Sequence, residues 1–166
     1  MILDIEPGKC TGCMACALYC SLAHEGWVIP RLSRIHILAA RQRQAIVPVA
    51  CIPCEEQACL SACPEPGAIH QDNDGRVVIE EGLCTACAKC ARACLIGAIR
   101  IHRLPGRGKK GKAVALKCDL CGGDPWCVRV CPSGAILVSE AQAASQAVFD
   151  RILTARRALE EGKKNR

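Results

Sequence analysis

Aromatic residues are scarce in this 166-residue chain, where two Trp, one Tyr and one Phe make up 2% of the sequence. Large aromatic side chains usually supply much of the buried apolar surface of a domain of this size. Their scarcity means that something other than an aromatic core must hold the fold together. The length suits one domain, or two small halves that share a surface, and disfavours an elaborate multidomain enzyme.

The chain also lacks three kinds of segment. Its N-terminal residues contain no basic region followed by an apolar run, so no secretory signal is visible. No apolar run approaches the roughly 18 residues of a membrane span. We therefore expect a soluble, cytoplasmic protein in a reducing compartment, where disulfides are disfavoured. No nucleotide-binding glycine motif or catalytic triad is recognisable, which argues against bond-making chemistry on a substrate.

Cysteine is the residue present in excess, with 16 copies. They fall into four groups of nearly equal spacing, which is an internal repeat. The first and third groups have the pattern C-x2-C-x2-C-x3-C, and the second and fourth lengthen only the middle gap. The groups are Cys10, Cys13, Cys16 and Cys20; Cys51, Cys54, Cys59 and Cys63; Cys84, Cys87, Cys90 and Cys94; and Cys118, Cys121, Cys127 and Cys131.

This spacing suits [4Fe-4S] clusters. Three cysteines in such a run can wrap around one cube and reach three of its corners, and thiolate is a soft ligand that suits iron. In two-cluster bacterial ferredoxins the last cysteine, commonly followed by proline, binds the other cluster. Pro64 and Pro132 match that signature, whereas Ser21 and Leu95 replace the proline in groups one and three. Sixteen cysteines at four per cube predict four clusters, with ligands that cross between groups.

Other uses of the cysteines fit less well. Four-thiolate zinc sites normally combine two separated C-x2-C pairs. Disulfides are disfavoured by the reducing compartment and by runs too tight for many unstrained bridges. A radical enzyme with a sulfonium cofactor would need C-x3-C-x2-C, an order that does not occur.

The formal charge of +6 counts every cysteine as neutral. Sixteen thiolates and four oxidised cluster cores would bring the charge to roughly −2, so we interpret the basic residues largely as compensation. Four cations inside or beside the groups are expected to stabilise reduced clusters, with solvated surface as the alternative. They are Lys89, Arg92, Lys117 and Arg129.

Two further residue types lie near the groups. Trp126 is expected to shield a cluster from water. The histidines are interpreted as surface or packing residues, because cysteines already fill every ligand position. They are His24, His36, His70 and His102.

The remaining pattern predicts an α+β fold of small βαβ-like modules around the clusters, with a C-terminal helix. The predicted strands are residues 33–40, 76–80, 98–104, 113–117 and 135–139, and a turn leads into a further strand at Ile69. Residues 103–112 indicate a solvated basic hairpin tip, or else a docking patch for an acidic partner. From Ser139 to Lys164 one helix face is apolar, so this helix packs on the module or docks a neighbour.

Residues 10–25 and 118–127 resemble a known family, the four-cluster iron-sulfur subunits of molybdenum and tungsten oxidoreductases, and the resemblance covers about residues 1–140. The family includes subunits of formate dehydrogenase and dimethyl sulfoxide reductase. The two segments look most like the polyferredoxin subunits of tungsten aldehyde oxidoreductases, and also like those beside carbon monoxide dehydrogenase.

The resemblance implies tandem bacterial-ferredoxin-like modules with pseudo-twofold symmetry. An outer pair of groups (10–20 and 118–131) and an inner pair (51–63 and 84–94) would form a domain of residues 1–138, followed by a helix and basic tail at 139–166. The implied ligand sets are Cys10, Cys13, Cys16 and Cys131; Cys20, Cys118, Cys121 and Cys127; Cys51, Cys54, Cys59 and Cys94; and Cys63, Cys84, Cys87 and Cys90.

The implied role is non-catalytic electron transfer between a tungsten- or molybdenum-pterin catalytic subunit and a flavin- or NAD-linked acceptor subunit. The C-terminal helix is expected to mediate subunit contacts, including contacts with further copies of the protein. Alternatives are a free-standing polyferredoxin or redox sensor, whose basic hairpin would contact a diffusing partner or nucleic acid, and an electron-transfer subunit of carbon monoxide dehydrogenase, formate dehydrogenase or hydrogenase.

Overall fold

The computed structural model describes residues 1–40, 45–104, 112–140 and 145–164. Its elements are short apart from two helices. The strands are β1 (Ile2–Ile5), β2 (His36–Ala40), β3 (Ala45–Val49), β4 (Ile69–Gln71), β5 (Val77–Ile79), β6 (Arg100–Arg103), β7 (Ala113–Leu116) and β8 (Ile136–Ser139). The helices are α1 (Ala15–Glu25), α2 (Ala58–Ser61), α3 (Lys89–Ala93), α4 (Trp126–Arg129) and α5 (Ser145–Lys164), and 3-10 turns cover Pro7–Lys9, Pro30–Leu32 and Leu120–Gly123.

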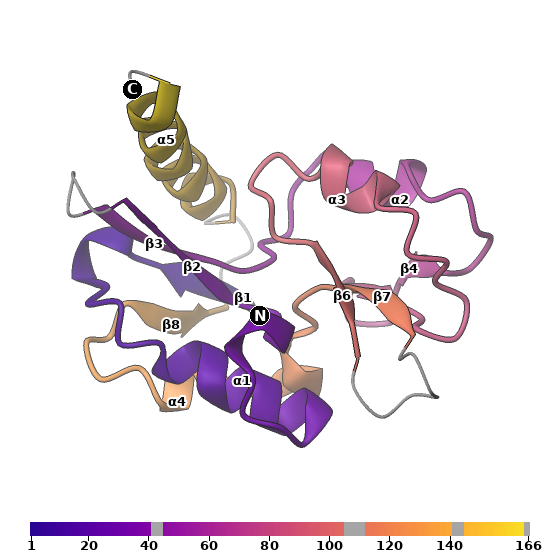
Figure 1. The fold of residues 1–166 in the computed structure, drawn as a ribbon, viewed down its shortest axis with the longest axis horizontal. Coiled ribbons are helices and arrows are strands. Elements are labelled where there is room, and N and C mark those ends of the chain that lie inside the picture. Colours follow the sequence, from indigo (N-terminus) through magenta and orange to yellow (C-terminus); the bar gives the residue numbers. More distant parts are fainter. Residues whose placement is uncertain (41–44, 105–111, 141–144, 165–166) are drawn as a thin grey trace.

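The elements form two halves that lie side by side (Figure 1). In one half α1 packs against α4, and strand β1 pairs with β8, so that segments far apart in the sequence meet. The other half holds α2 against α3, together with the pairs β4–β5 and β6–β7. Cysteine groups one and four therefore belong to the first half, and groups two and three belong mainly to the second. The predicted mixture of short helices and strands is confirmed, whereas the pseudo-twofold symmetry stays a prediction.

The strands pair differently from the expected βαβ-like modules. A βαβ unit joins parallel strands through a crossover, but the described strands form four separate antiparallel pairs. Antiparallel partners can be joined by short turns, and β4 and β5 are separated by only five residues. The cysteine loops and short helices lie between the pairs. The βαβ interpretation is therefore wrong, and each module is a hairpin-like pair with a helical turn.

The core is aliphatic. Ile2, Leu3 and Ile5 of β1 are fully buried, and Leu3 and Ile5 pack in a cluster that includes Ile136 of β8. Phe149 is the buried aromatic residue, at 8% exposure, whereas the Tyr and the two Trp residues are 40–59% exposed. Several cysteines belong to the same packed clusters, so the cysteine sites take the central place that aromatic residues occupy elsewhere.

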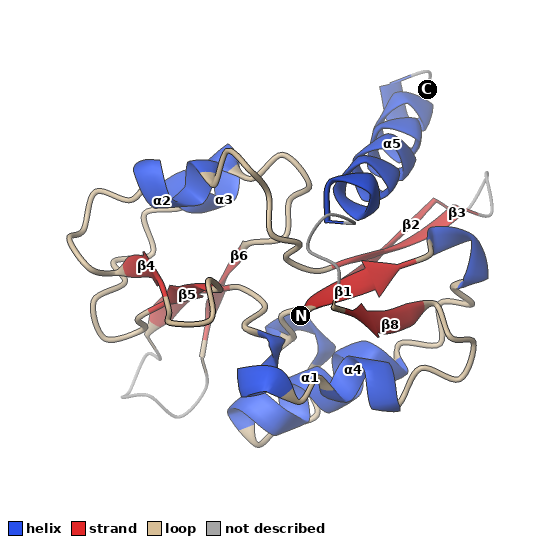
Figure 2. Cartoon of the chain, turned by 180° about the vertical axis from the view of Figure 1, so that it is seen from behind, coloured by secondary structure: helices blue, strands red, loops and turns tan. Residues whose placement is uncertain are grey.

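Helix α5 lies over the sheet formed by β2 and β3, as the view from behind shows (Figure 2). Val148 and Ile152 are fully buried, and Phe149 and Leu159 are nearly so. The apolar face predicted from the sequence is thus covered by the chain itself. The prediction that the helical segment starts at about Ser139 is wrong, because Ser139 is the last residue of strand β8; the helix is described over Ser145–Lys164.

Two expectations concern segments at the edge of the described structure. Strands β6 and β7 pair from Arg100–Leu116 to Arg103–Ala113, as the two arms of a hairpin would. Residues 105–111 of the basic tip lie outside the described residues. Within the described ranges, no helix is long and apolar enough to cross a membrane.

Candidate iron-sulfur sites

A repeated left-handed backbone turn shapes the cysteine loops. The residue before the second cysteine has positive φ in three groups, at Gly12 (72°), Ala86 (56°) and Leu120 (60°). Left-handed backbone is unfavourable by roughly 1–2 kcal/mol for a residue with a Cβ. Three groups with different residues at this position share the conformation. We infer that the left-handed turn is what directs successive cysteines of a group toward one site.

The third cysteine of each of groups one, two and three lies on a helix that starts directly after such a turn. The residues at these helix starts are Met14, Gln57 and Ala88, all with positive φ. Along α1, Cys16 and Cys20 are one turn apart on one buried face. One turn of α1 therefore presents two cysteines on the same face of the helix.

The structure brings the cysteines together in four sets. In each set, the first three cysteines of one group lie near the last cysteine of another group. The sets are Cys10, Cys13, Cys16 with Cys131; Cys118, Cys121, Cys127 with Cys20; Cys51, Cys54, Cys59 with Cys94; and Cys84, Cys87, Cys90 with Cys63. We call these sets A, B, C and D.

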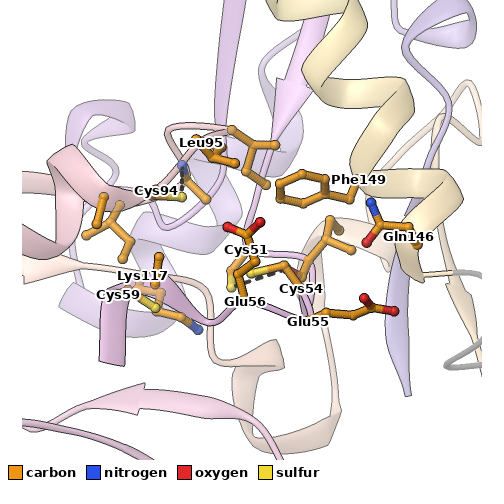
Figure 3. A pocket seen from close by; sticks show the side chains of 16 residues that line it. Cys51, Cys54, Glu55, Glu56, Cys59, Cys94, Leu95, Lys117, Gln146 and Phe149 are labelled. Carbon is orange, nitrogen blue, oxygen red and sulfur yellow. Dashed lines mark hydrogen bonds between the residues drawn. The ribbon is translucent and has the colours of Figure 1, made fainter. Parts of the chain in front are cut away.

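Set C surrounds a cavity of about 180 Å³ that is lined by all four of its cysteines. Figure 3 shows these side chains with Lys117 on one side and with Phe149 and Gln146 of α5 on another. The four cysteines of set D line a second, smaller cavity. Both cavities are bounded by apolar side chains and by the short helices that carry the cysteines.

Burial and neighbouring thiols raise the pKa of cysteines in sets A and B. Burial, followed by the negative charges of Cys10, Cys13 and Cys131, raises the pKa of Cys16 to about 12. Burial, followed by Cys20 and Cys121, raises the pKa of Cys127 to about 12 in the same way.

The inner sets behave alike. Burial, followed by Cys51, raises the pKa of Cys59 to about 11, and the charge of Cys94 adds to the effect. Burial also raises the pKa of Cys90, and Cys84 and Cys63 raise it further. Thiolates crowded in this way repel one another unless positive charge lies between them.

This donor set fits a [4Fe-4S] cluster. Each set offers four thiols, the soft ligands that such clusters use. A positively charged metal core would replace the protons that burial otherwise forces onto the sulfurs. Backbone amides also donate to sulfur, from Arg34 to Cys20 Sγ at 3.2 Å and from Ala98 to Cys94 Sγ at 3.3 Å. Such bonds stabilise negative charge on the ligands and help to set cluster potentials.

The sets lie close to one another in a fixed order. Burial raises the pKa of Cys127 in set B most, and the charge of Cys16 in set A raises it further, so these two sets are neighbours. Burial raises the pKa of Cys118 in set B most, and the charge of Cys127 raises it further. The charge of Cys51 in set C adds a smaller effect, so sets B and C are also neighbours. Cys59 of set C and Cys90 of set D pack in one apolar cluster. The order along the molecule is therefore A, B, C, D.

His24 has a more specific place than a surface or packing residue. Its Nε2 lies 3.0 Å from Asp119 Oδ1, and its Nδ1 lies 2.9 Å from the backbone oxygen of Cys20. Burial alone would lower its pKa, but Asp119, Cys121 and Cys20 raise the pKa of His24 to about 12. His24 follows Cys20 by four residues and lies on the same face of α1. This spacing is the sequence signal that places His24 beside the cysteines of set B.

The other histidines fit the expected interpretation. His36 is buried, and its Nδ1 has no hydrogen-bond partner in the described structure. His70 Nε2 lies 3.7 Å from Glu80 on a half-exposed part of the surface. Burial and then Arg100 lower the pKa of His102. None of these three lines a cavity with the cysteines among the pockets of the described residues.

Three of the four predicted cations are solvent-exposed. Lys89 and Arg92 are exposed on α3, and Arg92 Nη2 donates to the backbone oxygen of Cys87 at 3.4 Å. Arg129 pairs with an exposed aspartate at 3.1 Å and lies 5.5 Å from the ring centre of Trp126. Lys117 differs, since it is 7% exposed and lines the cavity of set C.

Trp126 stacks on Tyr19, with 6.3 Å between ring centres, and remains 40% exposed. It is therefore at most a partial cover for its neighbour Cys127. Set C is covered instead by Phe149 and Gln146 of α5. The sequence pattern does not identify these two residues as neighbours of a cluster. No spacing rule links them to the cysteines, because helix and loop meet only in the folded chain.

Known proteins share these features. Residues 42–141 match the family model described as a 4Fe-4S dicluster domain. The chain is 38% identical over 127 residues to the polyferredoxin-like subunit of aliphatic sulfonate oxidoreductase from Pyrococcus furiosus, covering 76% of this chain and 69% of that protein. It is 32% identical over 152 residues to a subunit of the anaerobic dimethyl sulfoxide reductase of Escherichia coli, covering 80% of this chain and 69% of that subunit.

Another relative is much longer. The chain is 34% identical to the oxidoreductase AegA of Escherichia coli and aligns over 89% of its own length, but it spans only 23% of AegA. The expectation of [4Fe-4S] clusters as the cofactor is confirmed by the family match and by the polyferredoxin-like relative. The sets of cysteines and this match together identify the chain as a member of the 4Fe-4S dicluster domain family that binds [4Fe-4S] clusters.

Proposed function

We propose that this chain is a non-catalytic electron-transfer subunit, which carries single electrons between a tungsten- or molybdenum-pterin catalytic subunit and a flavin- or NAD-linked acceptor subunit. The observation that carries the proposal is the gathering of all sixteen cysteines into four neighbouring sets of four. The names of two relatives, subunits of a sulfonate oxidoreductase and of dimethyl sulfoxide reductase, support a place in an oxidoreductase complex.

We assign one cluster to each set, so that sets A, B, C and D together hold four [4Fe-4S] clusters. When bound, each cluster would accept and release one electron at a time. The assignment is supported by the crossing of the fourth cysteine between groups in every set. It is also supported by the arithmetic of the ligands, since no cysteine is left over.

The protein's own residues would fix the order of the sites and surround them. Sets A and B are joined through α1, which carries Cys16 of one set and Cys20 of the other. Sets B and C meet at Cys118 and Cys51. Apolar side chains, Phe149 among them, line the set C cavity beside the sulfurs and would limit the access of water to a cluster there. A continuous row of sites suits the passage of electrons through the chain better than the storage of electrons at one site.

The proposal also concerns the metal and the type of reaction of the catalytic subunit. The resemblance of residues 10–25 and 118–127 to tungsten aldehyde oxidoreductase subunits favours tungsten and an aldehyde-type reaction in the partner. We place the complex in the cytoplasm, since reducing conditions keep unloaded cysteines free for cluster assembly.

Affinity purification of the tagged full chain under anaerobic conditions tests this proposal. We expect a large pterin-containing chain to co-purify in a fixed ratio, with tungsten or molybdenum detected by elemental analysis. A chain that purifies alone from cells expressing its natural neighbours, with all clusters in place, would contradict the proposal and favour a free-standing polyferredoxin.

A further inference from the structure

Lys117 is a buried cation between two cysteine sets. It follows β7 directly and precedes Cys118, the first cysteine of set B. Its side chain lines the cavity enclosed by set C and also a neighbouring cavity lined by Cys51, Cys54, Cys59 and Cys118. Sets B and C therefore share one lysine.

The hydrogen bonds of Lys117 hold its ammonium group in place. Nζ donates to the backbone oxygen of Cys118 at 3.0 Å and to the backbone oxygen of Val77. Both acceptors are neutral, and Lys117 forms no ion pair with a carboxylate in the part of the chain that the structure describes. Its charge is thus left to act on the neighbouring sulfurs.

The two cavities bring Lys117 beside the cysteines of both sets. Cys51 and Cys59 of set C and Cys118 of set B line the same cavities as Lys117. Other charged residues share these cavities, namely Glu55 and Glu56 in the first and Arg76 and Asp119 in the second. Because a lysine side chain is ordinarily positive at neutral pH, Lys117 places a cation next to both sets of sulfurs.

We propose that Lys117 raises the reduction potentials of the clusters held by sets B and C, and so makes the two middle sites of the row easier to reduce than they would otherwise be. The inference rests on the proposed four-cluster function. An electron added to a cluster in either set would increase the negative charge there, and a buried cation that lines both cavities would stabilise that charge. Lys117 gains and loses nothing in this step, since it only positions a charge.

Exposed cations in the same chain provide the comparison. Lys89 is exposed and directly precedes Cys90 of set D, just as Lys117 directly precedes Cys118. Solvent and salt screen an exposed charge far more than a buried one. Lys89 should therefore have little influence on the potential of set D, although both lysines are next to a ligand in the sequence.

The test is an EPR-monitored redox titration of the isolated, cluster-loaded full chain, with iron content measured on each sample. Lys117→Met removes the charge and keeps the length of the side chain, Lys117→Arg keeps the charge, and Lys89→Met is the matched control. We expect Lys117→Met to move two of the four reduction steps to lower potential, while Lys117→Arg and Lys89→Met leave all four near their original values.

Three results would overturn the proposal. The first is an unchanged set of potentials in Lys117→Met with full iron content. The second is an equal shift of all four steps, which would indicate a general change in the fold. The third is loss of iron in Lys117→Met and in a second neutral variant, Lys117→Gln, but not in Lys117→Arg, since Lys117 would then be needed to assemble the sites. None of these readings depends on the partner subunit, whereas an iron content of two clusters per chain would count against the four-cluster function itself.

Discussion

Single residues in strained backbone positions shape the cluster loops. Ala88 has a φ of 63° at the start of α3, where glycine would be unstrained. Met14 occupies the corresponding position in group one, so the sequence repeat alone does not reveal the strain. We expect cluster ligation to hold the loop in this shape, which would explain how Ala and Met are tolerated.

Replacing Ala88 by glycine relieves that strain. We expect Ala88→Gly to stabilise the loaded protein by about 1 kcal/mol, because the left-handed conformation penalises a Cβ by that amount. The measurement is urea unfolding under anaerobic conditions. Ala23→Gly, at an exposed position within α1, is the control with the opposite sign and should cost about 1 kcal/mol. A loss of stability in both variants would contradict the strain argument.

His36 predicts how stability depends on pH. Burial, with smaller effects from Arg100 and Arg156, lowers the pKa of His36 to about 3 in the folded chain. An unfolded histidine takes up a proton below about pH 6.5, and the folded chain resists that proton. Protonation of His36 therefore does not affect the free energy of unfolding above about pH 6.5. As the pH falls from 6.5 toward 3, proton uptake by the unfolded chain lowers the free energy of unfolding.

The expected loss at pH 5.5 is about 1.4 kcal/mol relative to pH 7.5, because pH 5.5 lies about one unit below the unfolded pKa. Thermal unfolding of the loaded protein at the two pH values measures it. His36→Gln should reduce the difference in Tm between the two pH values, because glutamine takes up no proton in this range. An equal pH dependence in the variant and the original chain would show that His36 is not responsible.

At the scale of elements, α5 is part of the cluster region as well as a C-terminal appendage. Its residues Phe149 and Gln146 line the set C cavity, and the helix packs against β1, β2 and β3. Deletion of everything after Ser139 would therefore uncover a cluster site as well as remove the helix. Contact with a neighbouring subunit through α5 stays a prediction, and it would use the polar face.

Phe149→Ala tests the covering role of α5. Phe149 is 8% exposed, and removing a buried ring of this kind costs about 3 kcal/mol and leaves a void. Water and oxygen would then reach one site, so we expect part of the cluster absorbance to bleach faster in air. Leu137→Ala, at a position that is 46% exposed on β8, is the control and should bleach at the original rate. Equal rates in both variants would contradict a cover formed by α5.

The strands show what pattern reasoning can and cannot reach. The predicted runs at 76–80, 98–104, 113–117 and 135–139 each contain an observed strand, because short runs rich in aliphatic residues and bounded by turns are a local signal. The pattern does not indicate strand β3, since Pro48 interrupts it. A two-stranded pair leaves one edge of each strand without ladder bonds, so the missing N–H of proline is tolerated there.

At the scale of the whole molecule, the cysteines are predictable from the sequence and their surroundings are not. Spacing alone indicates four groups and crossed ligands, because a short loop can reach only three corners of a cube. Spacing cannot distinguish Lys117 from Lys89 or Arg92, since only the folded chain places Lys117 in the cavities beside sets B and C. The contact of His24 with Asp119 joins residues 95 positions apart, so no local pattern could indicate it.

The central claim is that every cysteine of this chain is a cluster ligand. Under this proposal, the sixteen cysteines in four sets would hold four [4Fe-4S] clusters. The most direct test is measurement of iron and acid-labile sulfide per chain in the anaerobically prepared, full-length protein. We predict roughly sixteen iron and sixteen sulfide. Values of roughly eight each, or zinc in place of iron, would contradict the account.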